Sequence, residues 1–284
     1  MENLSHSQWT GKTGGTPWMQ RALITMYRWL PLHMLYGVMA LVVPFYMLFR
    51  RKSYKAIYSY FRQRMGYGCW KAFLNVYRNH FVFGQVVLDR FAVYAGKKFH
   101  FVIDGEEQFS QLADGSEGFV MLSSHVGNYE LAGYSLHSVK KKIHALVYDG
   151  ESTTVKEQRS KILSRQNIEV IPVRNDMAHL FAVNGALDEG HIVSMLSDRI
   201  FGSQKALTMD FLGAPAKFPQ GPFSLARAKG VPMLAIFVMK VKAREYRVLV
   251  RRVADEKAFV GTLEQVVRQY PTQWFNYYNF WSTQ

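Results

Sequence analysis

The sequence contains no acidic residue between Glu2 and Asp89, and Cys69 is its only cysteine. A single cysteine cannot form an intramolecular disulfide or build a cysteine-based metal cluster, so we expect a domain that faces a reducing compartment. The sequence also lacks internal repeats, low-complexity linkers and a glycine-rich phosphate loop of the nucleotide-binding type. These absences exclude a disulfide scaffold and a repeat array.

The positive charge of the chain is concentrated in its N-terminal third. Residues 1–88 hold 11 Lys or Arg and one acid, whereas residues 89–284 hold 24 and 20, within a net charge of +14. The basic residues flank an apolar stretch rather than forming a separate stripe, so an anionic membrane surface or an acidic carrier protein fits better than a nucleic acid. With 49% hydrophobic and 15% aromatic residues, the chain is expected to form one main domain with an N-terminal extension.

The apolar stretch runs from Leu30 to Phe49 without Lys, Arg, Asp or Glu, and its 20 residues approach the length that crosses a bilayer as a helix. Pro31 and Pro44 weaken it as a straight helix, so three interpretations stay open: a spanning helix, an in-plane or re-entrant anchor, and a buried soluble helix. The basic residues from 50 to 55 favour a cytoplasmic location for the domain on their C-terminal side. We expect residues 1–52 to anchor the chain to a membrane and residues 53–284 to form the main domain.

The periodicity of residues 53–284 predicts an α/β fold. Residues 53–95 read as aromatic-rich amphipathic helices. Short apolar runs then predict strands at 99–103, 119–123, 143–148, 170–173, 192–196, 233–241 and 246–253, the last two as an antiparallel hairpin, and helices are predicted at 128–138, 154–166, 176–188 and 221–229. This alternation is typical of a mostly parallel central sheet flanked by helices.

A candidate catalytic pair comes directly after the predicted strand at 119–123. In the segment SSHVGNYE, His125 lies between the strand and a predicted helix, and Glu130 comes five residues later. Strand ends that lead into helices are where catalytic groups gather in open α/β sheets. Along one continuous helix, five residues would turn the two side chains about 140° apart. They meet only if His125 lies in the turn, where the Glu130 carboxylate would hold one imidazole nitrogen and leave the other to take a proton. The alternative is that His125 only caps the helix.

A second stretch, residues 192–221, strengthens the catalytic interpretation. It places Asp198 and Arg199 at another strand end, then a short strand that ends in Phe211-Leu212-Gly213, then a helix start at Pro219-Gln220-Gly221. The order of these elements resembles the bacterial lipid A biosynthesis acyltransferase family, within the wider glycerolipid and lysophospholipid acyltransferase superfamily. The resemblance rests on the membrane segment with its basic flank, the H-x4-D/E motif at His125 and Glu130, Asp198-Arg199, the F-x-G-x-x-A-x-x-P-x-G element from Phe211 to Gly221, and the ending Tyr270-Pro271-Thr272-Gln273-Trp274.

The resemblance implies an acyltransferase of bacterial lipid biosynthesis, with lipid A and lipopolysaccharide as the family's context, on the inner membrane and facing the cytoplasm. It implies direct transfer from an acyl thioester, acyl carrier protein or coenzyme A, to a hydroxyl or amine of a membrane lipid, with no bound cofactor and no metal. His125 and Glu130 would be catalytic. Substrate-binding roles would fall to residues of both stretches: Asn128, Asp198, Arg199, Phe211, Gly213, Phe218 and Gly221. Arg199 either stabilises the oxyanion or forms a structural ion pair with Asp198, and Phe211, Leu212, Phe218 and Phe223 either line an acyl slot or pack the core.

The C-terminal residues depart from the family pattern. Members that act on lipid A commonly follow Gln-Trp with a basic group, whereas this chain continues from Asn276 to Trp281 without a charged residue. An amino-acid lipid or a lysophospholipid therefore stays open as the acceptor. Two other classes are weighed: a membrane-bound lipid-binding scaffold, which an intact His125/Glu130 pair argues against, and a hydrolase, which lacks a G-x-S-x-G turn at Ser123 and Ser124.

Overall fold

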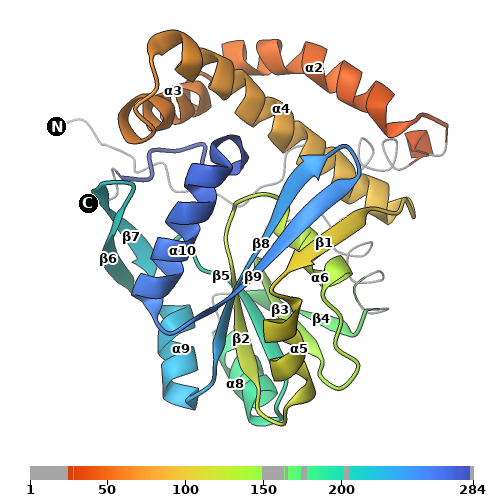
Figure 1. Cartoon of the computed structure of the whole chain (residues 1–284), viewed down its shortest axis with the longest axis vertical. Coiled ribbons are helices and arrows are strands. Elements are labelled where there is room, and N and C mark those ends of the chain that lie inside the picture. Colours follow the sequence, from red (N-terminus) through yellow and green to blue (C-terminus); the bar gives the residue numbers. More distant parts are fainter. Residues whose placement is uncertain are drawn as a thin grey trace.

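The structure, a computed structural model, describes residues 25–27, 29–148, 163, 166–173, 178–200 and 205–281. A twisted sheet lies at the centre, with helices on both of its faces and a layer of long helices across one end (Figure 1). That layer consists of α2 (Leu32–Phe49), α3 (Arg51–Ser59), the π-helical turn η1 (Tyr60–Arg64) and α4 (Cys69–Tyr94). The amphipathic helices expected over residues 53–95 are therefore present.

The main sheet has seven strands in the order β1-β9-β8-β2-β5-β3-β4. The strands are β1 (His100–Asp104), β2 (Phe119–Ser123), β3 (Ile143–Tyr148), β4 (Ile168–Val173), β5 (Ile192–Leu196), β8 (Met233–Lys242) and β9 (Glu245–Val253). All neighbours pair in parallel except β8 and β9, which form the predicted antiparallel hairpin. The predicted fold class, a mostly parallel sheet flanked by helices, is confirmed.

The two faces of the sheet carry separate hydrophobic cores. Successive residues of a strand point to opposite faces, so Phe119 and Met121 of β2 join one core while Val120 and Leu122 join the other. The Phe119 side is covered by α5 (Glu106–Asp114) and the short α6 (Ala132–Ser135). The Val120 side is covered by α8 (Ala178–Asp188), α9 (Gly221–Lys229) and α10 (Glu256–Gln269). Because both faces of β2 are buried, the strand reads as a continuous apolar run.

Helix α2 lies along α4 rather than apart from the domain (Figure 1). Leu32, Leu35 and Tyr36 are buried against Leu88 and Phe91 of α4. The opposite face of α2 is exposed and apolar, with side chains such as Leu41, Phe45 and Phe49 more than 60% accessible. The helix is long and apolar enough to cross a membrane; its packing gives it one protein-facing and one outward-facing side.

A buried polar cluster ties α2 to the sheet. The Tyr36 hydroxyl donates to the Asp89 carboxylate of α4, and so does the Tyr246 hydroxyl of β9. Lys240 Nζ of β8 lies 2.6 Å from Asp89 Oδ2 and 3.0 Å from the Tyr36 hydroxyl. Burial raises the pKa of Asp89 and lowers that of Lys240, while their mutual attraction acts against both shifts. Helix α2 is thus joined to the domain by charge-assisted hydrogen bonds as well as by apolar contact.

Several segments differ from the sequence expectations or lie outside the described residues, and helices α5 and α10 were not predicted. The helix predicted at 128–138 is wrong: a 3₁₀ turn at Tyr129–Leu131 leads into the single turn of α6, and the chain is extended at Leu136. The helix predicted at 154–166 lies almost wholly outside the described residues. A second sheet, β6 (Ala206–Phe211) and β7 (Ala214–Pro219), forms a hairpin whose second strand was not predicted.

Candidate active site

Two neighbouring strand ends bring the candidate catalytic residues together. Strands β2 and β5 pair in parallel with Ser123 opposite Leu196, and Ser197 N continues the pairing by donating to Ser123 O at 2.8 Å. His125 and Asp198 each lie two residues beyond their strand. Because parallel strands end at the same edge of a sheet, the two side chains meet at that edge.

Asp198 holds His125 through two hydrogen bonds. Its Oδ1 lies 2.8 Å from His125 Nδ1, and its Oδ2 accepts from the backbone N of His125 at 2.9 Å. An ionised carboxylate only accepts hydrogen bonds, so Nδ1 carries the proton and, in the neutral ring, Nε2 carries the lone pair. The His125 side chain is 12% accessible and that of Asp198 is 1% accessible. The pair is an imidazole oriented by a buried carboxylate.

Burial and charge set the ionisation of this pair. Burial lowers the pKa of the His125 imidazole below its usual value and the positive charge of Arg199 lowers it further, while the charges of Asp198 and Glu130 act in the opposite direction. Burial by itself would raise the pKa of Asp198, but the charge and hydrogen bonds of His125, together with Arg199, hold that pKa below its usual value. At neutral pH the site therefore contains a neutral imidazole beside a carboxylate, which is the state that a general base requires.

Glu130 takes a different position from the one predicted. From the sequence we expected the Glu130 carboxylate to hold one imidazole nitrogen of His125. In the structure the carboxylate at Nδ1 is that of Asp198. Glu130 Oε1 lies 2.6 Å from Arg90 Nη1, and Oε2 accepts from the Tyr94 hydroxyl at 3.3 Å. Glu130 acts on the ring through its charge, which raises the pKa of His125. Arg90 and Tyr94, both on α4, were missed because they lie about one helical turn apart in a segment that reads as ordinary amphipathic helix.

The turn that presents His125 is fixed by its backbone. Gly127 has a φ of 61°, and a Cβ at this position would lie 2.1 Å from the carbonyl oxygen of Val238. Gly127 N donates to Gln273 O and Asn128 N donates to Val238 O, both at 2.8 Å. Only glycine combines this φ with this close approach at low cost. The side chain of Asn128, predicted to bind substrate, is buried and donates at 3.3 Å to Val86 O and to the Tyr246 hydroxyl.

Residues 273–281, which we call the C-terminal wall, lie beside this turn. Phe275 N donates to His125 O at 3.1 Å, and Val126 and Trp274 form an isolated antiparallel bridge. Arg199 Nη2 donates to Phe275 O at 2.6 Å, and its guanidinium lies 5.7 Å from the centre of the Tyr278 ring. Arg199 therefore links the Asp198 strand end to the wall, and its charge acts on both His125 and Asp198.

The element from Phe211 to Gly221 packs beside the site. Phe211, Phe218 and Phe223 are each no more than 1% accessible, and Phe211 contacts the rings of Trp274 and Phe280. These residues were expected either to line an acyl slot or to pack the core, and their burial and ring contacts are those of core packing. Leu212 and Gly213 both have positive φ and form the tight turn between β6 and β7, while Gly221 begins α9.

Comparisons with known proteins give one solved structure to describe and one family model. A crystal structure of PlsC, the 1-acyl-sn-glycerophosphate (LPA) acyltransferase from Thermotoga maritima, matches 90% of this chain and 96% of its own, with a TM-score of 0.36 and 14% sequence identity. No curated protein sequence matches. The family model described as bacterial lipid A biosynthesis acyltransferase matches residues 90–283, which is more than half of the chain and includes His125, Asp198 and the C-terminal wall. Acyl transfer to a lipid acceptor is the activity that this match supports, and the chain belongs to the bacterial lipid A biosynthesis acyltransferase family.

Proposed function

We propose that the chain transfers a fatty acyl group from an acyl thioester to a hydroxyl or amine of a membrane lipid acceptor, with His125 as the general base. The donor is acyl carrier protein or coenzyme A carrying the acyl group, and the acceptor is a lipid A precursor or a related bacterial lipid, with an amino-acid lipid or a lysophospholipid as the alternative. The observation that carries this proposal is the hydrogen bond from His125 Nδ1 to Asp198, which directs the lone pair of the ring to Nε2.

In the proposed reaction the acceptor O–H or N–H gives its proton to Nε2 while the oxygen or nitrogen attacks the thioester carbonyl. The carbonyl carbon becomes tetrahedral, the C–S bond then breaks, and the thiolate takes the proton back from the imidazolium. The carboxylates of Asp198 and Glu130 stabilise that imidazolium, since the charge of each raises the pKa of His125. No acyl-enzyme forms, and the imidazole returns to its neutral state.

The developing oxyanion needs donors that are already in place, and removing one such donor costs about 3 kcal/mol in known sites. The backbone N–H groups of Gly127 and Asn128 are occupied by the carbonyls of Gln273 and Val238, so these two groups do not serve. Arg199 is the stronger candidate, because its positive charge already acts on His125.

We further propose that α2 is an in-plane anchor. Its buried face packs against α4 and contacts the buried polar cluster of Asp89, and its opposite face is exposed and apolar. The exposed basic residues Arg50, Arg51 and Lys52 come directly after the helix. This arrangement suits a helix that lies in the interface of an anionic membrane with the domain on the cytoplasmic side of the inner membrane. If an accessibility label placed on residues at both ends of α2 reached both from the same side of a vesicle, the helix would be in-plane; opposite-side labelling would show a spanning helix.

The activity test uses purified full-length protein with radiolabelled acyl carrier protein, with and without a bacterial lipid extract. Radiolabelled lipid identifies a transferase, free fatty acid identifies a hydrolase, and an unchanged donor identifies a binding scaffold. His125→Ala, checked for native folding by circular dichroism, should abolish transfer. A folded His125→Ala protein that kept near-wild-type transfer would show that the proposed base is wrong.

A further inference from the structure

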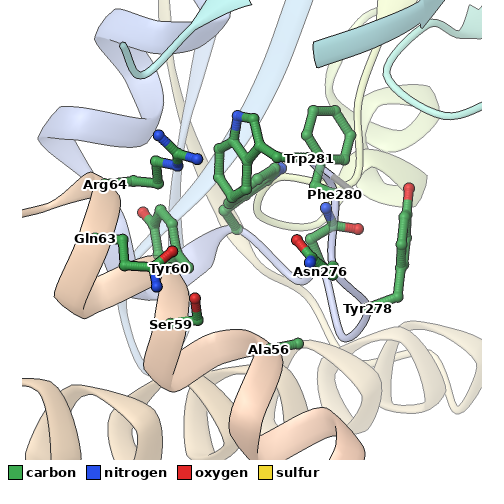
Figure 2. Close-up of a pocket in the computed structure, with 11 residues that line it drawn as sticks. Ala56, Ser59, Tyr60, Gln63, Arg64, Asn276, Tyr278, Phe280 and Trp281 are labelled. Atoms are coloured by element: carbon green, nitrogen blue, oxygen red, sulfur yellow. The ribbon is translucent and has the colours of Figure 1, made fainter. Parts of the chain in front are cut away.

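A small pocket lies between the helical layer and the C-terminal wall. Its helical side comes from α3 and η1, including Tyr60 and Arg64, and its other side comes from the segment that includes Asn276, Tyr278 and Trp281 (Figure 2). It holds about 260 Å³ of empty space with its open mouth included. The innermost part has room for roughly one water molecule, so it suits a single compact polar group rather than a sugar ring.

Three side chains that line this pocket carry buried polar atoms without a hydrogen bond in the described part of the chain. They are Arg64 through Nε, Trp274 through Nε1 and Asn276 through both ends of its amide. Burial raises the pKa of Tyr278 to about 12, and hydrogen bonding with the nearby Asn276 acts in the opposite direction, although neither end of the Asn276 amide has a partner within ordinary hydrogen-bond geometry among the described residues. Buried polar atoms of folded proteins are almost always paired, with a ligand or water where protein groups are missing. Three such side chains in one pocket therefore indicate an occupant.

The chemistry of the lining favours an anion. Arg64 is the only charged residue among those described that line the pocket. Its guanidinium lies 4.7 Å from the centre of the Trp281 ring, and none of the ion pairs among the described residues includes Arg64. Among the buried lining atoms without a hydrogen bond, the nitrogens of Arg64, Trp274 and Asn276 are three donors and the Asn276 amide oxygen is the one acceptor. A carboxylate or phosphate oxygen would satisfy the donors and balance the charge.

The pocket adjoins the candidate active site. Asn276 directly follows Phe275, whose N–H donates to His125 O and whose carbonyl accepts from Arg199. On its other side α3 follows directly after α2, whose outer face is apolar. A single-chain amphiphile with its tail along α2 and its head in this pocket would therefore approach the turn that carries His125.

We propose that this pocket binds the anionic oxygen group, a carboxylate or a phosphate, of the lipid acceptor's headgroup and so selects a compact acceptor with a single anionic group, such as an amino-acid lipid or a lysophospholipid, rather than a lipid A precursor. The proposal rests on the proposed function, and it adds Arg64 and Asn276 as the residues that determine acceptor specificity. The same anionic chemistry occurs in the phosphates of coenzyme A and of the phosphopantetheine arm of a carrier protein, so the experiment must separate the two sources.

Equilibrium binding to the full-length protein in detergent, without any donor, tests this directly. The probes are N-decanoylglycine, its neutral carboxamide, decyl phosphate and coenzyme A. We expect the two anionic amphiphiles to bind about tenfold or more tightly than the carboxamide, as for a hydrogen bond to a charged group. Arg64→Gln should remove that preference and Asn276→Leu should weaken it, whereas Arg64→Lys should keep part of it. Lys55→Gln, which removes an exposed charge from α3 outside the pocket, is the matched control and should change nothing.

Equal binding of the carboxylate and carboxamide probes to the wild-type protein would overturn the proposal. So would an equal loss in Lys55→Gln, and so would an Arg64-dependent binding of coenzyme A with none for the amphiphiles. A thermal melt of each variant separates loss of binding from loss of folding. If Arg64→Gln unfolds, binding to Arg64→Lys is measured in its place. Acyl transfer that persists while Arg64→Gln leaves probe binding unchanged would refute this inference but not the proposed function. Selective probe binding without any acyl transfer would refute the proposed function but not this inference.

Discussion

Asp198 accepts two hydrogen bonds from His125, one from ring atom Nδ1 at 2.8 Å and one from the backbone N at 2.9 Å. Because both donors belong to one residue, the carboxylate fixes the rotation of the ring and the position of the turn together. This double contact makes Asp198 the residue on which the orientation of the base depends.

Substitution Asp198→Asn should lower kcat by about 10³-fold to 10⁴-fold, as is typical when an amide replaces the carboxylate behind a catalytic histidine and favours the wrong tautomer. Asn is nearly isosteric with Asp, so the protein should stay folded. Steady-state transfer assays and circular dichroism give the two readings. Asp210→Asn, at an exposed position on β6, is the matched control, and a similar loss of activity there would contradict the assignment.

The acid limb of the pH profile should report His125. Its pKa is lowered by burial and by Arg199, and the base works only when neutral, so kcat/KM should rise with pH to a plateau whose midpoint lies below the usual value of 6.5. Arg199→Met removes a positive charge and makes protonation easier, so it should move the midpoint to higher pH.

Glu130→Gln should move the same midpoint in the opposite direction. Loss of its negative charge removes an influence that raises the pKa of His125, so the profile should shift to lower pH. The two shifts of opposite sign form one test. If both variants moved the midpoint the same way, or neither moved it, the titrating group would not be His125 between these two charges.

The ion pair of Glu130 with Arg90 should be measurable in stability. Each side chain is about 15% accessible or less, so Glu130→Gln is expected to lower the free energy of unfolding by about 1 to 3 kcal/mol. A double-mutant cycle with Arg90→Met, followed by chemical denaturation, should give a coupling energy above about 0.5 kcal/mol. Strict additivity of the two substitutions would mean that the pair contributes nothing.

Lys240→Met should be the most destabilising single change in the buried polar cluster. It leaves the Asp89 carboxylate buried without its cation, at a cost of about 3 to 5 kcal/mol. Adding Asp89→Asn removes the stranded charge, so the double variant should recover much of that loss. Thermal or chemical unfolding measures both. A double variant less stable than Lys240→Met alone would argue against the buried charge as the cause.

The strands of the main sheet were predictable because each is a short apolar run between polar turns, and β2, β3 and β5 begin and end at the predicted residues. The helix predicted at 128–138 failed because tertiary hydrogen bonds decide that segment: Gly127 and Asn128 donate to Gln273 and Val238 instead of starting a helix. The local sequence does not reveal that the carbonyls of Gln273 and Val238, which are distant along the chain, accept these hydrogen bonds. Strand β7 was missed because its two prolines, Pro215 and Pro219, argue against a strand except in small or edge pairings.

The order of the strands explains why Asp198, and not Glu130, is the carboxylate at Nδ1 of His125. Asp198 and Glu130 are both plausible carboxylates from the sequence, and Glu130 is the nearer one along the chain. Only the pairing of β2 with β5 brings Asp198 to the ring, and periodicity does not reveal which strands are neighbours. Similarly, the contact of Glu130 with Arg90 joins residues 40 positions apart on elements whose packing is set by the whole fold.

The attachment of Tyr36 to Asp89 and Lys240 has a practical consequence for anyone who wants a detergent-free enzyme. A shortened protein that began after α2 would expose the Asp89 carboxylate and the Lys240 ammonium, which are buried in the folded chain, to water. It would also expose the apolar side of α4. Polar replacements on the outward side of α2, at positions such as Leu41 and Phe45, would improve solubility and leave the contacts of Tyr36 with Asp89 and Lys240 in place.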